Sequence, residues 1–237
     1  KNIYWLNVAR GLLMDAVPDR KTSPGGTSKG FFEYTLQLEQ DLIPAENLTN
    51  DPHADYWYWD WVMAGVPGID GKNFNFRAYS VSPDSHTATI TARLQGISNT
   101  GAKCDHHAVI SINGHTVGEG IWDGVAPYTI VAYFDQVFLK NGDNTIGVKA
   151  VLDPDVDYSL FFIDSFDVSY ARQYHATDDI LFFEAGGSSS IRVDGFSTSP
   201  ITVLNITNPL QPVLTTSDSV KGETGNFSVI IHPDNAN

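Results

Sequence analysis

The sequence predicts an all-β protein: a jelly-roll β-sandwich over residues 1–171, followed by a smaller Ig-like β unit over residues 172–237. First, apolar and polar residues alternate through several short runs rich in β-branched and aromatic residues, as is typical of half-buried strands. Second, clusters of Gly, Asn, Ser and Pro separate these runs and supply turns. Third, no segment keeps a 3.6-residue apolar period, so long amphipathic helices are not expected.

The composition is that of a globular protein that avoids anionic partners. A chain of 237 residues can bury a substantial core, and 12% aromatic with 18% charged residues argues against a disordered chain. Its 28 acidic and 14 basic residues leave a net charge of −14, which repels phosphate backbones, so nucleic acid is not an expected partner. No apolar run approaches the ~20 residues that span a bilayer, so membrane insertion is not expected either.

The first elements follow from this alternation. Ile3-Tyr-Trp-Leu-Asn-Val8 predicts an opening strand, and a chain that begins without Met or a leader is expected to be a processed piece of a longer protein. Residues 18–30 concentrate Pro, Gly, Ser and Thr and predict a long loop. The next run, residues 31–41, places its alternate apolar side chains on one face of a strand: Phe32, Tyr34, Leu36 and Leu38.

The middle of the chain carries further strand signals. Residues 55–62 bring three tryptophans onto one face if the run is extended, and residues 87–94 alternate cleanly. Asn113-Gly114 separates two alternating runs and supplies the positive φ angles of a type I′ hairpin turn. Residues 139–151 pass through a turn cluster into a strand, and residues 161–170 predict the last strand of the sandwich.

Beyond Tyr170 the pattern changes to short apolar runs between Gly, Ser and Pro clusters. Four strands are expected there, over residues 179–184, 190–196, 201–206 and 226–231. Two prolines, Pro209 and Pro212, would hold the chain extended between strands. Because the unit is short and ends without an obvious cap, we expect the natural polypeptide to continue past Asn237.

The run Cys104-Asp-His-His107 combines a thiol with carboxylate and imidazole groups. In a strand, alternate side chains point to opposite faces, so these four cannot converge on one metal ion. A nucleophilic dyad needs thiol and imidazole within about 3 Å, which adjacency in sequence does not supply. We therefore expect a buried thiol rather than a catalytic one, and no enzymatic activity in this chain. As the only cysteine, Cys104 also excludes an intramolecular disulfide.

Aromatic side chains are the main candidates for ligand binding, because a flat indole can stack on the face of a sugar. Same-face aromatics on a strand usually point inward, so Trp57, Trp59 and Trp61 are interpreted as core, with an exposed platform as the alternative. Trp122 lies between Gly120 and Gly124 and is expected in an exposed loop. Trp122 and Asp123 are the predicted ligand-binding pair.

The order of the motifs resembles the region that precedes the catalytic domain in gingipain-type cysteine peptidases, bacterial exported proteins with a caspase-like catalytic fold. The motifs that carry the resemblance are Tyr4-Trp-Leu6, Glu39 and Asp41, Asp55-Tyr-Trp-Tyr-Trp59, Asn113-Gly-His-Thr-Val-Gly118, Trp122-Asp-Gly124, Asp164-Ser-Phe-Asp-Val-Ser-Tyr170, Val193-Asp-Gly-Phe196 and Leu204-Asn-Ile-Thr-Asn-Pro209. The family's catalytic His and Cys belong to a downstream domain that this chain lacks.

The resemblance implies a non-catalytic accessory region that is secreted or held at the cell surface, with the downstream peptidase domain of the same polypeptide as its partner. The alternative is a carbohydrate-binding module that uses exposed aromatics and a structural calcium. Reading the gene beyond Asn237 would separate these hypotheses.

A structural calcium ion is the expected cofactor. Residues 161–170 resemble the final strand of a galactose-binding-like jelly roll, a fold that often holds calcium between an early acidic strand and its last one. Glu39, Asp41 and Asp164 are the predicted ligands, since carboxylate oxygens from separate strands can hold the two together. Solvated carboxylates without a metal remain the alternative.

Overall fold

The computed structural model describes residues 16–18, 30–46, 48, 55–188, 190–216, 219–222 and 226–233. The predicted strand at residues 3–8 lies outside these ranges. The chain forms two compact units, one of residues Phe31–Gln173 and one that joins Lys1–Gly30 with Tyr174–Asn237. The sequence predicts a sandwich over residues 1–171. Within its first 30 residues, however, the described strand β1 (Ala16–Pro18) pairs in parallel with β15 (Val213–Thr216) of the small unit.

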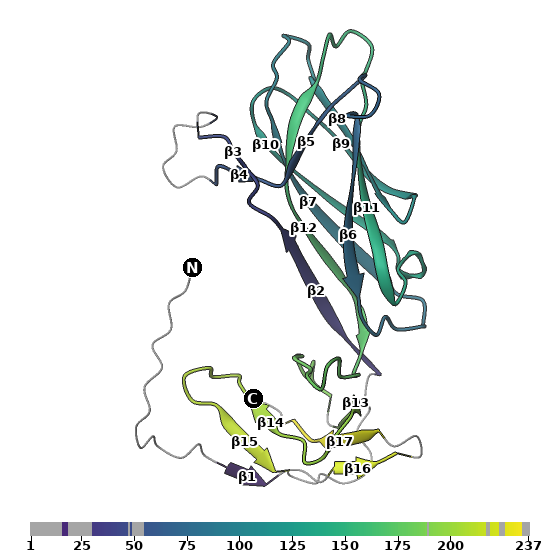
Figure 1. The fold of residues 1–237 in the computed structure, drawn as a ribbon, viewed down its shortest axis with the longest axis vertical. Helices are drawn as coiled ribbons and strands as arrows, with labels where there is room; N and C mark the ends of the chain where they lie inside the picture. Colours follow the sequence, from purple (N-terminus) through teal and green to yellow (C-terminus); the bar gives the residue numbers. More distant parts are fainter. Residues whose placement is uncertain are drawn as a thin grey trace. The chain divides into compact units, whose positions relative to one another are not determined.

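The all-β prediction is confirmed, and the large unit is a sandwich of two antiparallel sheets (Figure 1). The first sheet has the order β10-β7-β12-β2, with β5 paired to the first part of β12. Its strands are β2 (Phe31–Glu39), β5 (Asp60–Met63), β7 (Thr87–Gly96), β10 (Pro127–Asp135) and β12 (Leu160–Gln173).

The second sheet has the order β6-β11-β8-β9. Its strands are β6 (Gly71–Ala78), β8 (His106–Ile112), β9 (His115–Trp122) and β11 (Gly142–Ala150). A 3₁₀ turn, η1 (Gln136–Phe138), follows β10, and the described residues contain no helix long and apolar enough to cross a membrane.

The core lies between the sheets and follows the alternation of the sequence. Each strand contributes every second side chain, so one face of each sheet is apolar. On β7 all four predicted inward residues are buried: Ala88, Ile90, Ala92 and Leu94. Facing them are Ile110, Ile112, Ile146 and Val148 of the second sheet. Burial stabilises the fold by about 25 cal/mol for each Å² of apolar surface removed from water.

The predicted hairpin at Asn113-Gly114 joins β8 to β9, and both residues have positive φ, 49° and 85°. The Asn113 side chain also reaches outside the hairpin. Its amide group donates to the Phe138 carbonyl at 2.7 Å, and its oxygen accepts from the Thr145 N–H at 2.9 Å. The turn residue therefore ties the hairpin to two neighbouring segments.

The described residues of the small unit form two three-stranded sheets. One has the order β1-β15-β14, with β14 at Val203–Asn205, and the other has the order β13-β17-β16, with β13 (Ile191–Phe196), β16 (Ser219–Lys221) and β17 (Phe227–Ile231). The predicted strand at residues 179–184 is wrong. Asp178 and Asp179 adopt positive φ and turn the chain there, and the Asp179 carboxylate accepts from Ser197.

Candidate functional site

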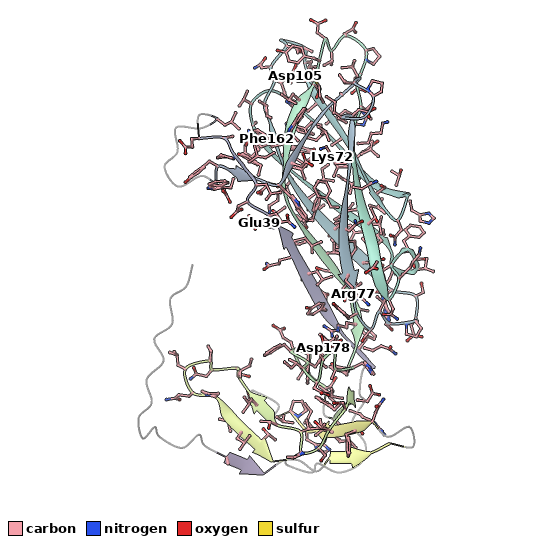
Figure 2. The ribbon with its side chains drawn as sticks, viewed as in Figure 1. Glu39, Lys72, Arg77, Asp105, Phe162 and Asp178 are labelled. Atoms are coloured by element: carbon pink, nitrogen blue, oxygen red, sulfur yellow. The ribbon has the colours of Figure 1, made fainter. Side chains whose placement is uncertain are left out.

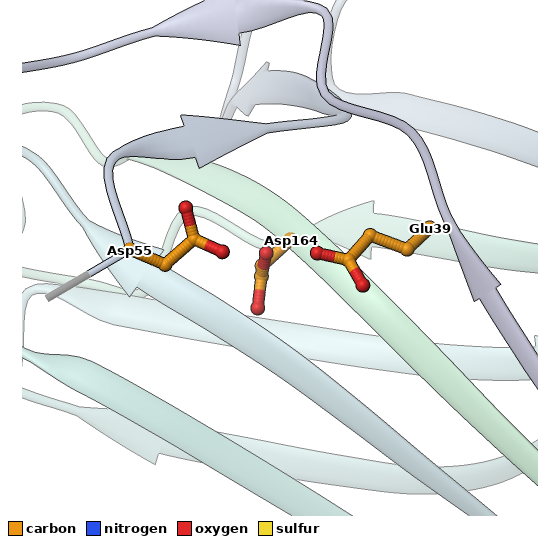
Figure 3. A group of neighbouring side chains, drawn as sticks. All are labelled: Glu39, Asp55 and Asp164. Carbon is orange, nitrogen blue, oxygen red and sulfur yellow. The ribbon is translucent and has the colours of Figure 1, made fainter. Parts of the chain in front are cut away.

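Three carboxylates converge at one edge of the first sheet. One oxygen from each of Glu39, Asp55 and Asp164 lies within 4.8 Å of the others. Glu39 ends β2, Asp55 lies two residues before β4 (Trp57–Tyr58), and Asp164 lies within β12. Figure 3 shows the three side chains pointing toward one another. We call this group the acidic triad.

Asp164 occupies the point where β12 changes partners. The first part of β12 pairs with β5 as far as Ile163 opposite Asp60, and the pairing with β2 begins at Ser165 opposite Glu39. On the other side, against β7, the register shifts between Ile163 and Ser165, so Asp164 is the extra residue of a β-bulge. Bulges re-aim side chains, and this one directs a carboxylate toward the end of β2.

Asp55 is held by its own turn. The backbone N–H of Trp57 donates to Asp55 Oδ1 at 2.9 Å, a local bond typical of Asp before a strand. The same segment forms a small hairpin in which β3 (Ile43–Pro44) pairs with β4. The hairpin thus carries one carboxylate to the two that belong to the sheet.

The acidic triad concentrates negative charge that the described residues do not neutralise. Burial raises the pKa of Glu39, and the charges of Asp164 and Asp41 raise it further. Burial also raises the pKa of Asp164, which is opposed by a hydrogen bond from Ser165. Asp164 Oδ1 is buried and has no hydrogen-bond partner among the described residues. Such oxygens suit a hard cation.

Arg93 is the described cation whose charge acts on the triad, and it is engaged elsewhere. Arg93 lies close enough for its charge to lower the pKa of both Glu39 and Asp164. Its guanidinium, however, donates to Asp167 Oδ2 at 2.7 Å. One shared positive charge does not balance three converging carboxylates.

The structure thus brings together two of the three predicted metal ligands, Glu39 and Asp164. The third, Asp41, lies outside the triad, although its charge acts on both partners. Asp55 takes its place and was missed, because the sequence does not reveal that the hairpin folds back on the sheet. Its position directly before the aromatic run was the one available signal.

Trp122 is not an exposed loop residue, and that prediction is wrong. Only 6% of its surface is accessible, and its ring stacks on Tyr128 with a centroid distance of 4.9 Å. Its glycine neighbour on β9 has a packing role, because a Cβ at Gly120 would stand 2.5 Å from the Tyr128 ring. Asp123 is exposed beside it, and its role as a ligand group stays a prediction.

The other tryptophans do not share one environment, because the chain bends at Trp59 between β4 and β5. Trp59 packs against Phe74 and Phe166, as expected for a core residue, and Trp61 is half-buried. Trp57 is exposed, next to the exposed Tyr56, and their ring centroids are 5.9 Å apart. The exposed aromatic pair is therefore Tyr56 and Trp57, beside Asp55.

The Cys104–His107 run lies at the end of the sandwich, where Figure 2 shows Asp105 far from Glu39. Asp105 is buried and accepts from the backbone N–H groups of Thr100 and Gly124. His106 is also buried, and its Nδ1 lies 2.9 Å from Ser159 Oγ. His107 points the other way and contacts the Asp153 carboxylate at 3.0 Å. These contacts of Asp105, His106 and His107 join the segments that meet at this end of the sandwich.

Both ionisable groups in this network, Asp105 and His106, are buried, and burial acts on their pKa values in opposite directions. Burial lowers the pKa of His106, because the charged imidazolium would lose its hydration. Burial would raise the pKa of Asp105, but hydrogen bonds from Thr100 and Gly124 stabilise its charge and lower the pKa overall. The network is a neutral imidazole beside a carboxylate, and it is consistent with a structural role.

Comparison with known proteins supports the fold alone. No family model and no curated protein matches the sequence. A solved structure of dimeric latent PorU from Porphyromonas gingivalis aligns with a TM-score of 0.63 at 10% identity, over 93% of this chain and 20% of that one. The chain thus spans about a fifth of the PorU chain.

Weaker similarities link the sandwich to carbohydrate-binding modules. A family 35 module from Cellvibrio japonicus Abf62 aligns with a TM-score of 0.36 at 19% identity, over 59% of this chain and 97% of that one. A family 36 module in complex with calcium and xylotriose aligns with a TM-score of 0.33 at 16% identity, over 57% and 98%. These two are too distant to bear on function. The chain is an all-β protein similar in fold to part of PorU.

Proposed function

We propose that this chain is a non-catalytic accessory region of an exported gingipain-type cysteine peptidase. Its role is to position, shield or target a catalytic domain on the same polypeptide. The observation that carries the proposal is the similarity to PorU, which extends over 93% of this chain yet only 20% of the PorU chain. An alignment that includes both units, within a far longer protein, supports a part that works together with other domains.

The polar groups of the sandwich favour this reading over catalysis. His106 bonds with Ser159 and His107 with Asp153, so each ring is engaged in joining loops. In the small unit, His175 Nδ1 contacts the Asp194 carboxylate. The contact of His106 with Ser159 has the geometry of a base beside a hydroxyl nucleophile, but both residues are buried and lie out of reach of a substrate.

Calcium is the proposed cofactor of the acidic triad. Glu39, Asp55 and Asp164 would each supply an oxygen, and Asp41 is a candidate further ligand because its charge acts on the same cluster. Calcium prefers six to eight oxygen ligands, so backbone carbonyls and water would complete the shell. An ion here would join β2, β12 and the β3–β4 hairpin.

Carbohydrate binding is a second candidate function, favoured by the exposed Tyr56 and Trp57 beside Asp55. A groove of about 380 Å³ adjoins the same hairpin and is lined by Pro44, Ala45, Glu46, Leu48, Ile97 and Phe162. A glycan array tests this function. A hit that Trp57→Ala abolishes would support it, and an array without a reproducible hit would leave the accessory role alone.

The accessory role is tested by reading the coding region beyond Asn237 and expressing the longer protein. We expect a caspase-like segment that carries a His and Cys pair. Removal of residues 1–237 should then impair export or activity of the peptidase, while the isolated chain should cleave no member of a mixed peptide library. A coding region without a peptidase would refute the proposal.

A further inference from the structure

The sandwich is closed along one side, whereas along the other, of the described strands, only β5 approaches β6, where Lys72 and Asp60 form an ion pair. At the closed side, β9 lies against β10, and glycines make the close approach possible, because a Cβ at Gly118 would stand 2.6 Å from that of Ala132. At the other side, β2 and β6 are the outer strands of their sheets, and no comparable approach joins them in the part of the chain that the structure describes. Figure 1 shows β2 along this border.

The β2 edge lacks the proline, bulge and lysine that protect many sheet edges. Its nine residues, Phe31–Glu39, include no Gly, Pro or Lys, and its register with β12 is unbroken. Within the described sheets, residues 33–39 of β2 pair with β12 alone, so the second edge of this part of the strand can accept another strand. Leu36 and Leu38 pack against the core from one side and stay partly exposed. A further strand would cover them.

The charges of β2 indicate what kind of strand would fit. Its outward side chains are Glu33, Thr35, Gln37 and Glu39, all exposed. If two copies paired antiparallel over residues 33–39, Glu33 of each would oppose Glu39 of the other, and directly opposed like charges destabilise a sheet. A net charge of −14 adds long-range repulsion between copies. The edge is therefore suited to a basic strand rather than to itself.

We propose that the free edge of β2 is a docking site for an extended polypeptide segment with Lys or Arg opposite Glu33 and Glu39 and apolar residues over Leu36 and Leu38. This mode of binding adds a strand to a sheet, so backbone hydrogen bonds provide affinity and the alternating side chains provide specificity. The proposal deepens the accessory role and rests on it only in assuming that the chain acts by binding another polypeptide.

The probe is a synthetic peptide with the sequence Thr-Lys-Val-Thr-Val-Thr-Val-Lys-Thr, whose lysines have the same spacing as Glu33 and Glu39. Two control peptides are used. In the first, glutamate replaces both lysines, and in the second, alternate backbone nitrogens are methylated. Binding is followed by fluorescence anisotropy in calcium and in chelator, and hydrogen exchange locates the protected amides. We expect the lysine peptide to bind and to slow exchange within residues 31–39, and both controls to bind at least tenfold more weakly.

A charge swap separates specific pairing from general attraction. Glu33→Lys should weaken binding of the lysine peptide about fivefold, the size of a cross-strand charge pair, and should strengthen binding of the glutamate peptide. Asp84→Lys makes the same change of charge in an exposed loop and should leave both affinities unchanged. Equal effects of the two variants would mean that only net charge matters and would overturn the proposal.

Four other results would also overturn it. The methylated peptide could bind as well as the parent, or exchange could slow outside β2. Protection of residues 31–39 could rise with protein concentration, which would identify a second copy as the occupant. Binding could require deletion of residues 1–13, which would identify the chain's own opening segment. None of these results bears on whether a peptidase is encoded beyond Asn237, so the two proposals fail separately.

Discussion

The carboxylates of Glu39 and Asp164 meet where β12 exchanges β5 for β2 as its partner. Glu39 is the last residue of one strand, and Asp164 is the bulged residue of the other. At the bulge Asp164 has no partner in the ladder with β7, and it lies where β12 passes from β5 to β2. The charge gathered there leads to the first two predictions below.

Calcium should stabilise the fold through Asp164. An ion bound only by the folded state contributes roughly 2.7 kcal/mol when its concentration is a hundredfold above Kd. Melting temperatures measured in millimolar calcium and in chelator should differ for the wild type and coincide for Asp164→Asn. Asp143→Asn, at a highly exposed carboxylate, should retain the calcium response. Equal melting temperatures for metal-free and calcium-treated wild type would exclude the site.

The metal-free protein should respond to pH through the same carboxyls. Because the folded pKa values of Glu39 and Asp164 are raised, the folded state binds more protons than the unfolded state just above pH 4.5 and 3.8. The contribution of the triad to stability should therefore grow as pH falls through this window. Urea unfolding of the wild type and of Glu39→Gln from pH 7 to 4 measures this contribution as the difference between their free energies of unfolding. A constant difference between the two proteins would contradict the prediction.

His106 should make the protein sensitive to acid. Its folded pKa is lowered, so the neutral ring is favoured, and stability should be lost as pH falls below about 6.5, where the unfolded chain gains a proton. His106→Gln should cost about 1–3 kcal/mol at pH 7.5, because Ser159 loses its partner, and should flatten the pH dependence. The exposed His115→Gln is the matched control. If the free energy of unfolding of His106→Gln depended on pH as the wild type does, another group would be the source of the acid sensitivity.

Gly120→Ala should destabilise the closed side of the sandwich by about 1–3 kcal/mol, as overpacked positions do. The added methyl would stand 2.5 Å from the Tyr128 ring and 2.7 Å from Ile130. Gly30→Ala, at a position with no atom within 4 Å, should change the free energy of unfolding by less than about 0.5 kcal/mol. Chemical denaturation measures both, and similar values for the two variants would show that β9 and β10 can separate freely.

Trp122→Ala should unfold the sandwich rather than remove a ligand contact. Loss of a large buried aromatic costs about 3–5 kcal/mol. Trp122 packs on Tyr128, His106 and Phe161, so the cavity would open within the core. Trp57→Ala removes an exposed ring and should leave the melting temperature nearly unchanged. Circular dichroism melts of the two variants compare them, and a stable Trp122→Ala protein would contradict its burial.

Local patterns were sufficient for most of the sandwich. Alternation along residues 87–94 identified the inward side chains correctly, because side chains on a strand alternate regardless of its neighbours. Asn113-Gly114 identified the hairpin, because few dipeptides adopt two positive φ angles. Residues 179–184 contain the apolar run Ile180-Leu-Phe-Phe183, yet they form no strand, because two aspartates with positive φ turn the chain there.

The fold class, the main strands and two members of the acidic triad could be predicted from residue patterns. Which carboxylate completes the triad and which indole reaches solvent depend on tertiary packing. Asp55 joins Glu39 because a hairpin folds back on the sheet, and Trp122 is buried because Tyr128, on the next strand, covers it. Both outcomes depend on contacts with other strands. The periodicity of residues within one strand carries no information about those neighbouring strands.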